Sequence, residues 1–161
     1  MRVITGTARG RRLNELKGKE TRPTADRVKE GMFNIIQFDI EGRRVLDLFG
    51  GTGQLGIECL SRGAAHATFV DARTDAVKLI RENLALTDLA DRAAVLTADY
   101  ATVLSSAAEK YDLVFLDPPY ETKLLERSLE LISQFDILRE HGIIICESPQ
   151  EKILPELSAP Y

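Results

Sequence analysis

From residue 44 onward, short apolar runs alternate with helical stretches, and this alternation constrains the fold more than any other feature. The runs rich in apolar and β-branched residues span 44–49, 67–71, 94–98, 112–117 and 142–147. Stretches with helical character lie between them at 55–62, 75–86, 101–108 and 123–135. Near-continuously apolar strands separated by helices are typical of a parallel sheet that is covered on both faces. With right-handed crossovers, the pattern predicts an α/β fold with a Rossmann-like, doubly wound, mostly parallel sheet.

The N-terminal part of the chain differs from this core in pattern and in charge. Residues 1–24 read as an irregular basic arm with short strands possible at 2–5 and 11–13, and residues 25–38 have the spacing of an amphipathic helix. Residues 1–29 hold nine basic and three acidic groups, a net +6, whereas all 161 residues carry −4. Such asymmetry is typical of a segment that meets a polyanion, although a solvated basic surface has the same pattern. We therefore divide the chain into an N-terminal arm and helix, 1–41, which we expect to dock a polyanion, and a core, 42–161.

Several classes of protein are disfavoured by what the sequence contains. No stretch approaches the roughly 18 consecutive apolar residues of a membrane span, and the N-terminus has no signal-peptide pattern. Cys59 and Cys146 stand alone, and neither they nor His66 and His141 have metal-ligand spacing. We expect a soluble, cytoplasmic, monomeric protein that uses no metal.

A glycine-rich loop follows the first strand directly and is the first candidate binding feature. Gly51, Gly53 and Gly56 satisfy the G-x-G-x-x-G spacing, and Asp71 ends the next strand 20 residues after Gly51. A glycine turn at a helix N-terminus lets backbone N–H groups approach a ligand, and the acid suits the two ribose hydroxyls of an adenosine. The pattern predicts a nucleotide-like cofactor, which is either NAD or S-adenosylmethionine (SAM).

Two further acids favour SAM over NAD. Asp47 lies inside the strand before the glycines, where it would repel a pyrophosphate but suits a ligand that carries an ammonium and a sulfonium. Asp99 ends the third strand, just before Tyr100, where a carboxylate can accept from the adenine amino group, although a helix cap is the plainer interpretation. We assign Asp47, Gly51, Gly53, Asp71, Asp99 and Tyr100 to the cofactor site.

The fourth strand delivers the sequence Asp117-Pro118-Pro119-Tyr120 to the same edge of the sheet. Two prolines fix the backbone and leave carbonyl acceptors without N–H donors, beside a carboxylate and an aromatic ring. An exocyclic amine of a nucleobase needs acceptors for its hydrogens and a ring on which the base stacks. We predict that Asp117, Pro118 and Tyr120 are catalytic, and that proximity and orientation supply most of the rate.

Three parts of the sequence together resemble one known family: Leu46–Gly53, Asp117–Tyr120, and N-terminal motifs that include Gly6-Thr7-Ala8-Arg9-Gly10-Arg11 and Thr21-Arg22-Pro23-Thr24. On these residues the chain resembles the RsmD family, bacterial SAM-dependent methyltransferases that modify the guanine N2 amine of 16S ribosomal RNA. It implies a class I methyltransferase fold, SAM as cofactor, and one guanine of an assembling small ribosomal subunit as target. On the N-terminal segment we assign Arg9, Arg11, Arg12, Arg22 and Thr24 to RNA binding, arginine being suited to phosphate.

The resemblance also implies a C-terminal strand hairpin, which would begin where the chain stops at Ala159-Pro160-Tyr161; we expect those strands to be missing. Three other functions remain open from the residues alone. The Asp-Pro-Pro-Tyr corner equally suits a DNA adenine-N6 methyltransferase, and the glycine spacing suits an NAD-dependent oxidoreductase. The basic arm alone would suit a non-catalytic RNA-binding module.

Overall fold

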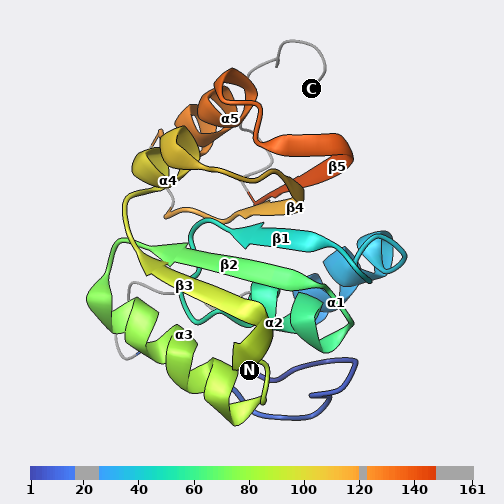
Figure 1. The fold of residues 1–161 in the computed structure, drawn as a ribbon. Helices are drawn as coiled ribbons and strands as arrows, with labels where there is room; N and C mark the ends of the chain where they lie inside the picture. Colours follow the sequence, from blue (N-terminus) through green and yellow to red (C-terminus); the bar gives the residue numbers. More distant parts are fainter. Residues whose placement is uncertain (17–25, 120–122, 148–161) are drawn as a thin grey trace.

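The computed structural model describes residues 1–16, 26–119 and 123–147. Five strands form one sheet in the order β3-β2-β1-β4-β5, and every neighbouring pair is parallel (Figure 1). The strands are β1 (Arg44–Asp47), β2 (His66–Asp71), β3 (Ala93–Thr97), β4 (Tyr111–Leu116) and β5 (Leu138–Cys146). The expected α/β fold with a doubly wound parallel sheet is confirmed.

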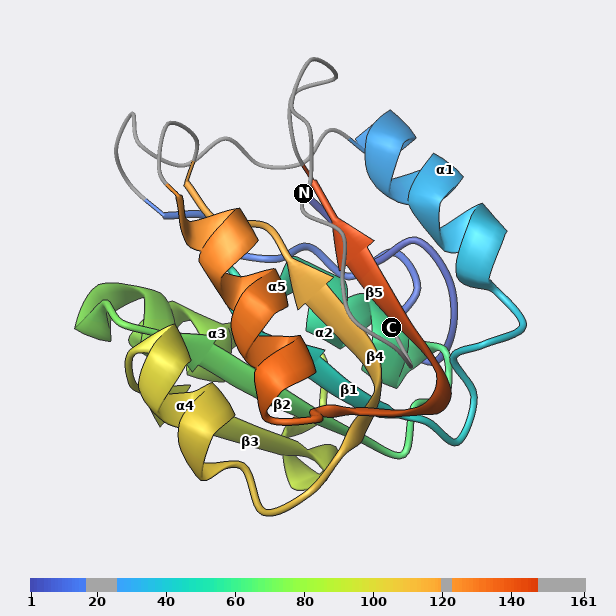
Figure 2. The same cartoon turned by 90° about the horizontal axis from the view of Figure 1, so that it is seen from above.

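Helices cover both faces of this sheet (Figure 2). One face carries α1 (Asp26–Ile36), α2 (Gln54–Ser61) and α3 (Thr74–Leu86); the other carries α4 (Tyr100–Ser106) and α5 (Leu124–Gln134). A short 3₁₀ helix, Ala90–Arg92, leads into β3. Strand residues alternate between two buried clusters: Val45 and Phe115 pack with α1, α2 and α3, whereas Leu46 and Val114 pack with α4 and α5. This period-two alternation follows from strand geometry.

The strand order places a topological switch point between β1 and β4. The chain leaves β1 toward one side of the sheet and reaches β4 on the other, so the loops after these two strands are neighbours at the carboxyl edge. In open α/β sheets ligands bind at this position. Both loops singled out in the sequence, Gly50–Gly56 and the one that begins at Asp117, lie there.

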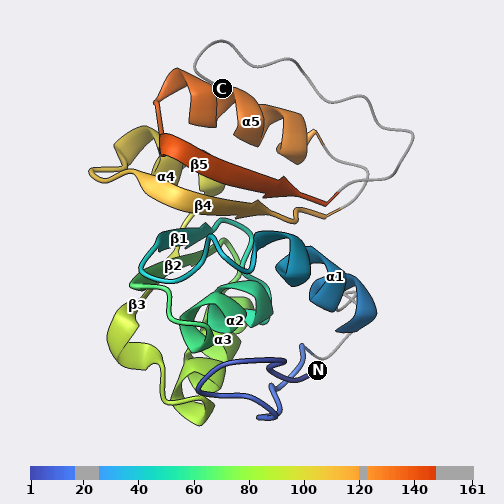
Figure 3. The ribbon, with the colours of Figure 1, turned by 90° about the vertical axis from the view of Figure 1, so that its right-hand side faces the viewer.

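Residues 1–16 pack against the core (Figure 3). In place of the two short strands expected at 2–5 and 11–13, the segment makes one antiparallel bridge, between Arg2 and Arg12. Val3, Ala8 and Leu13 are buried in the same cluster as α2. The separation of function between 1–41 and 42–161 stays a prediction.

Two residues of α2 hold this segment by its backbone. The Ser61 hydroxyl accepts from Ala8 N (3.0 Å) and donates to Thr5 O (2.7 Å). Gly6 has φ +95°, and a Cβ there would lie 1.9 Å from Ser61 O, so only glycine permits the close approach. The Glu58 carboxylate accepts from the N–H groups of Ile4 (2.8 Å) and Thr5 (3.0 Å).

Glu58 is also the centre of a buried ion network. Its side chain and that of Lys29 are both 0% exposed, with 3.2 Å between Lys29 Nζ and Glu58 Oε1. Arg62 Nε donates to Glu58 Oε2 at 2.9 Å, and Lys29 Nζ donates to Arg2 O at 3.2 Å. Burial would raise the pKa of Glu58, but its donors and the charge of Lys29 lower it; burial lowers the pKa of Lys29. The network joins α1, α2 and the N-terminal segment in one unit.

The described residues contain neither a helix suited to span a membrane nor a cluster suited to hold a metal ion. None of the helices in these ranges has the length and apolar character needed to cross a membrane. The same ranges contain no group of three or more His, Cys, Asp or Glu side chains arranged to hold a metal ion. The C-terminal strands expected to be missing would begin at 159–161, and these residues lie outside the described ranges.

Candidate functional site

The structure brings acids from four neighbouring strands to one edge of the sheet. Asp47 ends β1 and pairs in register with Phe115, so that Asp117 follows two residues further along β4. Asp71 ends β2 opposite Thr97 of β3, and Asp99 follows Thr97 by two residues. The glycine loop lies among these acids, directly after β1. The predicted cofactor residues are therefore gathered at one place.

The glycine loop has the left-handed conformations that its sequence predicts. Gly51 has φ +57° and Gly53 has φ +83°, a region that L side chains rarely adopt. At Gly51, no described atom beyond its chain neighbours lies within 4 Å of where a Cβ would be, so a ligand can approach the backbone there. At Gly56 a Cβ would lie 2.3 Å from the Phe69 ring, so this glycine is required for α2 to pack on β2.

Asp71 fixes the loop from the neighbouring strand. One carboxylate oxygen accepts from Gly51 N at 3.0 Å and the other accepts from Arg73 N at 2.9 Å. The side chain keeps 15% of its surface exposed at the loop. A carboxylate can accept more than two hydrogen bonds. Asp71 therefore shapes the glycine loop and still has acceptor capacity for a ligand.

Asp47 lies beneath the loop and is 1% exposed. One oxygen accepts from Gly56 N in the first turn of α2, at 3.2 Å. Burial raises the pKa of Asp47 to about 7, the hydrogen bond from Gly56 lowers it, and the charge of Asp71 raises it further. This balance makes Asp47 sensitive to a cation placed nearby, because a positive charge favours the ionised carboxylate.

Asp99 and Tyr100 begin α4 at the same edge. Asp99 is the helix N-cap, and one oxygen of its side chain accepts from Ala101 N at 3.1 Å. That oxygen therefore has the capping role that was the plainer interpretation of the sequence. The Tyr100 ring packs against Phe49, with ring centroids 5.6 Å apart. Phe49 was not predicted; its place directly before the glycines was the available signal. The aromatic pair offers an apolar wall beside the loop.

The loop after β4 also holds an acid in an unusual environment. Asp117 is half-buried and Pro118 is buried. Burial raises the pKa of Asp117 to about 8, with further contributions from the charge of Glu147, a hydrogen bond to its side chain, and the charge of Asp47. Glu147 was not singled out in the sequence, although it ends a predicted strand at this edge. Tyr120 lies outside the described residues.

The acids and hydrogen-bond acceptors around the glycine loop fit a cationic adenosine ligand such as SAM. Gln54, buried in the first turn of α2, has a side-chain oxygen with no hydrogen-bond partner in the described structure. Such an orphaned acceptor suits an N–H donor of a ligand. Arg73 Nε lies 3.7 Å from Asp75 Oδ1 and 4.0 Å from Asp71 Oδ1. This one arginine therefore faces two acids, and Asp47 adds a third acid beneath the loop. A pyrophosphate would meet the wrong charge here.

The N-terminal segment reaches this loop through Asn83, another residue that the sequence did not indicate. The buried Asn83 side chain accepts from Asn14 N (2.8 Å) and donates to Asn14 O (3.1 Å) and to Thr52 O (2.8 Å). Thr52 belongs to the glycine loop, so one amide side chain holds both segments. The segment proposed for RNA is thereby anchored beside the proposed cofactor loop.

The basic residues predicted to bind RNA differ in their surroundings. Arg9, Arg11 and Arg12 are all exposed, but Arg11 also donates to Leu86 O, at the C-terminus of α3, at 2.7 Å. Arg22 and Thr24 lie outside the described residues. Among the described residues of this set, Arg9 and Arg12 are exposed and, unlike Arg11, their side chains form no hydrogen bond to the core.

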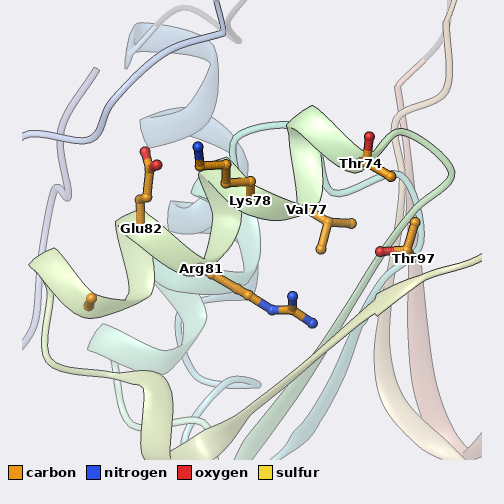
Figure 4. A pocket seen from close by; sticks show the side chains of 7 residues that line it. Thr74, Val77, Lys78, Arg81, Glu82 and Thr97 are labelled. Atoms are coloured by element: carbon orange, nitrogen blue, oxygen red, sulfur yellow. The ribbon is translucent and has the colours of Figure 1, made fainter.

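A surface recess of about 530 Å³ lies elsewhere, along α3 against the edge strand β3 (Figure 4). Its lining residues are Thr74, Val77, Lys78, Arg81, Glu82, Ala85 and Thr97. Arg81 extends toward β3 and donates to Val95 O at 3.2 Å. The recess contains none of the glycines and none of the acids of the edge, so the candidate site is defined by the loops.

Comparisons with known proteins agree with this geometry. Residues 1–159 match the model of a family described as conserved hypothetical protein 95. YlbH of Bacillus subtilis (strain 168), described as a candidate rRNA methyltransferase, is 43% identical over 97% of this chain and 86% of its own. Ribosomal RNA small subunit methyltransferase D of Escherichia coli (strain K12) is 36% identical over 99% of this chain and 80% of its own.

A solved structure is similar over the same span. It is yhhF from Escherichia coli, described as a candidate methyltransferase, and it superposes with a TM-score of 0.88 at 34% identity. The match covers 99% of this chain and 86% of that one.

Proposed function

This chain belongs to the conserved hypothetical protein 95 family, the RsmD family, and from that premise we propose that it methylates ribosomal RNA with SAM as methyl donor. In the finer form of the proposal, the acceptor is the exocyclic N2 amine of one guanine in 16S rRNA. The observation that carries the proposal is the meeting of two loops at the switch point. The glycine loop with its acids suits SAM, and the loop that begins at Asp117 suits an amine.

The cofactor residues are proposed from the fit described above. Asp71 would accept from ribose hydroxyls, Asp99 from the adenine amine, and Gln54 from an N–H donor. Gly51 and Gly53 leave the backbone open to the ligand, Tyr100 contributes an aromatic wall, and Asp47 supplies negative charge below it. When bound, SAM supplies a methyl group made electrophilic by its sulfonium.

The catalytic work of the chain's own residues is to orient a weak nucleophile. An exocyclic amine shares its lone pair with the ring, so acceptors at its hydrogens help to direct that lone pair outward. Asp117 and the carbonyl of Pro118 would accept these hydrogens, and Tyr120 would stack the base. Correct placement of two reactants can supply about 7–11 kcal/mol of the barrier in favourable cases.

The names of the relatives support an rRNA substrate for this chain. We propose that it acts in the cytoplasm, as a monomer and without a metal, on 16S rRNA in an assembling small subunit. The test supplies SAM carrying an isotopically labelled methyl group to naked 16S rRNA, to assembling subunits and to duplex DNA, and then identifies the methylated nucleoside. We expect N2-methylguanosine from RNA; methyladenine from DNA would favour the DNA alternative. Calorimetric titration with SAM and with NADH tests the NAD-dependent oxidoreductase alternative, which requires binding of NADH and not of SAM.

The first mutational prediction concerns Asp71. Replacing it with alanine should weaken SAM binding by roughly 1.5–3 kcal/mol, the range for hydrogen bonds to a charged group. Part of the loss would come from release of Gly51 N. Calorimetry measures the SAM Kd, and the matched control is Asp75→Ala, an aspartate in the first turn of α3 that is 70% exposed. Equal affinities for the folded Asp71 variant and wild type would remove Asp71 from the site.

The second prediction concerns the exposed arginines of the N-terminal segment. Changing Arg9 and Arg12 together to glutamine should weaken RNA binding and leave SAM binding unchanged. The slope of log affinity against log salt should flatten by about 0.7 per lost phosphate contact on single strands. Arg127→Gln, a half-exposed arginine of α5 on the opposite face, is the control. An unchanged affinity and slope in the double variant would mean that these charges serve solubility only.

A further inference from the structure

Asp117 and Glu147 follow two neighbouring parallel strands at the same level. Leu116, the last residue of β4, pairs in register with Cys146, the last residue of β5. Glu147 N donates to Leu116 O at 3.1 Å, which extends the ladder by one step. The next residue on each strand is therefore an acid, and the two side chains are joined by a hydrogen bond.

Two carboxyl groups can form such a hydrogen bond only when one of them keeps a proton, because ionised carboxylates are acceptors only. Among the described residues, the charged groups that act on Asp117 are Glu147, directly after β5, and Asp47 of β1, and both are acids. Burial is the largest influence, and it also favours the protonated form. Geometry and burial therefore both favour a proton on Asp117, and they raise its pKa to about 8.

We propose that Glu147 is a positioning residue of the methyl-transfer site, which holds the Asp117 carboxyl group in place by sharing one proton with it. This inference rests on the proposed function, because it assigns Asp117 the task of accepting from the target amine. A carboxyl group hydrogen-bonded by its neighbour keeps one orientation and still has acceptor oxygens for the amine. Without Glu147, Asp117 would lose this hydrogen bond and stay half-buried under the charge of Asp47.

The structure distinguishes this role from simple support of the strand ends. The ladder bond between the strand ends uses the backbone N–H of Glu147, which any residue except proline supplies. The hydrogen bond to Asp117 uses the side-chain carboxyl group instead. A change confined to the side-chain carboxyl therefore leaves the ladder and alters the pair.

The test compares kcat as a function of pH for wild type, Glu147→Ala and Glu147→Gln. The wild-type kcat should fall as the pH rises through about 8, because Asp117 then loses its proton and with it the hydrogen bond to Glu147. In Glu147→Gln the amide donates to Asp117 at every pH, so activity should persist and the alkaline fall should disappear. Glu147→Ala should lower kcat on the order of 10- to 100-fold, the size of effect that a misplaced group produces, with an unchanged SAM Kd.

The matched control is Glu140→Gln, the same chemical change on β5 at a side chain that is 90% exposed. It should reproduce the wild-type kcat and pH profile, and any titration of the RNA itself is common to all variants. Carbon-13 NMR of the Asp117 carboxyl provides a readout without substrate: its pKa should fall in Glu147→Gln. If the wild type is active and Glu147→Gln shows the same alkaline fall in kcat, the inference about Glu147 is wrong and the proposed function is unaffected. A wild type that methylates no RNA would overturn the proposed function and the inference with it.

Discussion

Replacing Asp117 with alanine is expected to lower kcat by about 100- to 1,000-fold, the range for losing one positioned hydrogen-bonding group at a reacting centre. The effect should fall on turnover and not on SAM binding, because the proposed contact is to the amine and strengthens in the transition state. Single-turnover methyl transfer at saturating RNA and SAM measures it. Asp117→Asn keeps one acceptor oxygen and should lose less activity than the alanine variant.

The comparison needs a control in which an aspartate away from the site is replaced by alanine. Asp39, an exposed aspartate in the loop after α1, provides it: Asp39→Ala should have wild-type turnover. Calorimetry with SAM shows that each variant is folded and binds the cofactor. Near-normal turnover in Asp117→Ala at saturating RNA would mean that the catalytic assignment is wrong, whatever the asparagine variant does.

The fold was predictable because each strand and helix is marked by the residues of its own stretch of sequence. Each buried strand of a parallel sheet is an apolar run, and the helices between them have their own spacing, so all five strands were expected at nearly their observed places. The start of β5 was the exception. The polar residues Arg139, Glu140 and His141 obscured it, and the structure begins the strand at Leu138, with an irregularity in the register against β4.

The candidate site was predictable where a residue ends a strand or lies in a glycine turn, because position along the chain then fixes position in space. Residues whose roles depend on distant contacts were missed. Asn83 has no distinguishing neighbours in sequence, yet it joins Asn14 to Thr52. Glu147 became visible only when the strand order placed β5 beside β4.

The packing of the N-terminal segment was missed for the same reason. Val3, Ala8 and Leu13 have neither helical nor strand spacing, so no periodicity marks them as core residues. Their burial depends on partners about 50 residues away on α2, above all Ser61 and Glu58. The charge count predicted only a basic arm, because it shows which side chains are charged. It does not show which backbone atoms form hydrogen bonds to the core.

The buried ion network leads to the largest expected effect on stability. Glu58→Ala would remove the ion-pair partner of the buried Lys29, which would keep the carbonyl of Arg2 as acceptor and the charge of Asp26. The N–H groups of Ile4 and Thr5 would also lose their acceptor. Breaking a buried pair by removing one partner costs about 3–5 kcal/mol. Lys29→Met should cost less, because Glu58 keeps Arg62 and the two backbone donors. Urea unfolding measures both losses.

The matched control is Glu130→Ala, which removes a half-exposed glutamate paired with Arg127 on α5 and should cost about 0–1 kcal/mol. Amide hydrogen exchange at Ile4 and Thr5 then separates two explanations of a loss in stability. If Glu58 anchors the segment, these amides should exchange faster in Glu58→Ala than global unfolding permits. RNA binding should weaken more than SAM binding, because Arg9 and Arg12 are carried on the released segment. A variant no less stable than Glu130→Ala, with slow exchange retained at both amides, would show that the apolar contacts of Val3, Ala8 and Leu13 hold the segment without Glu58.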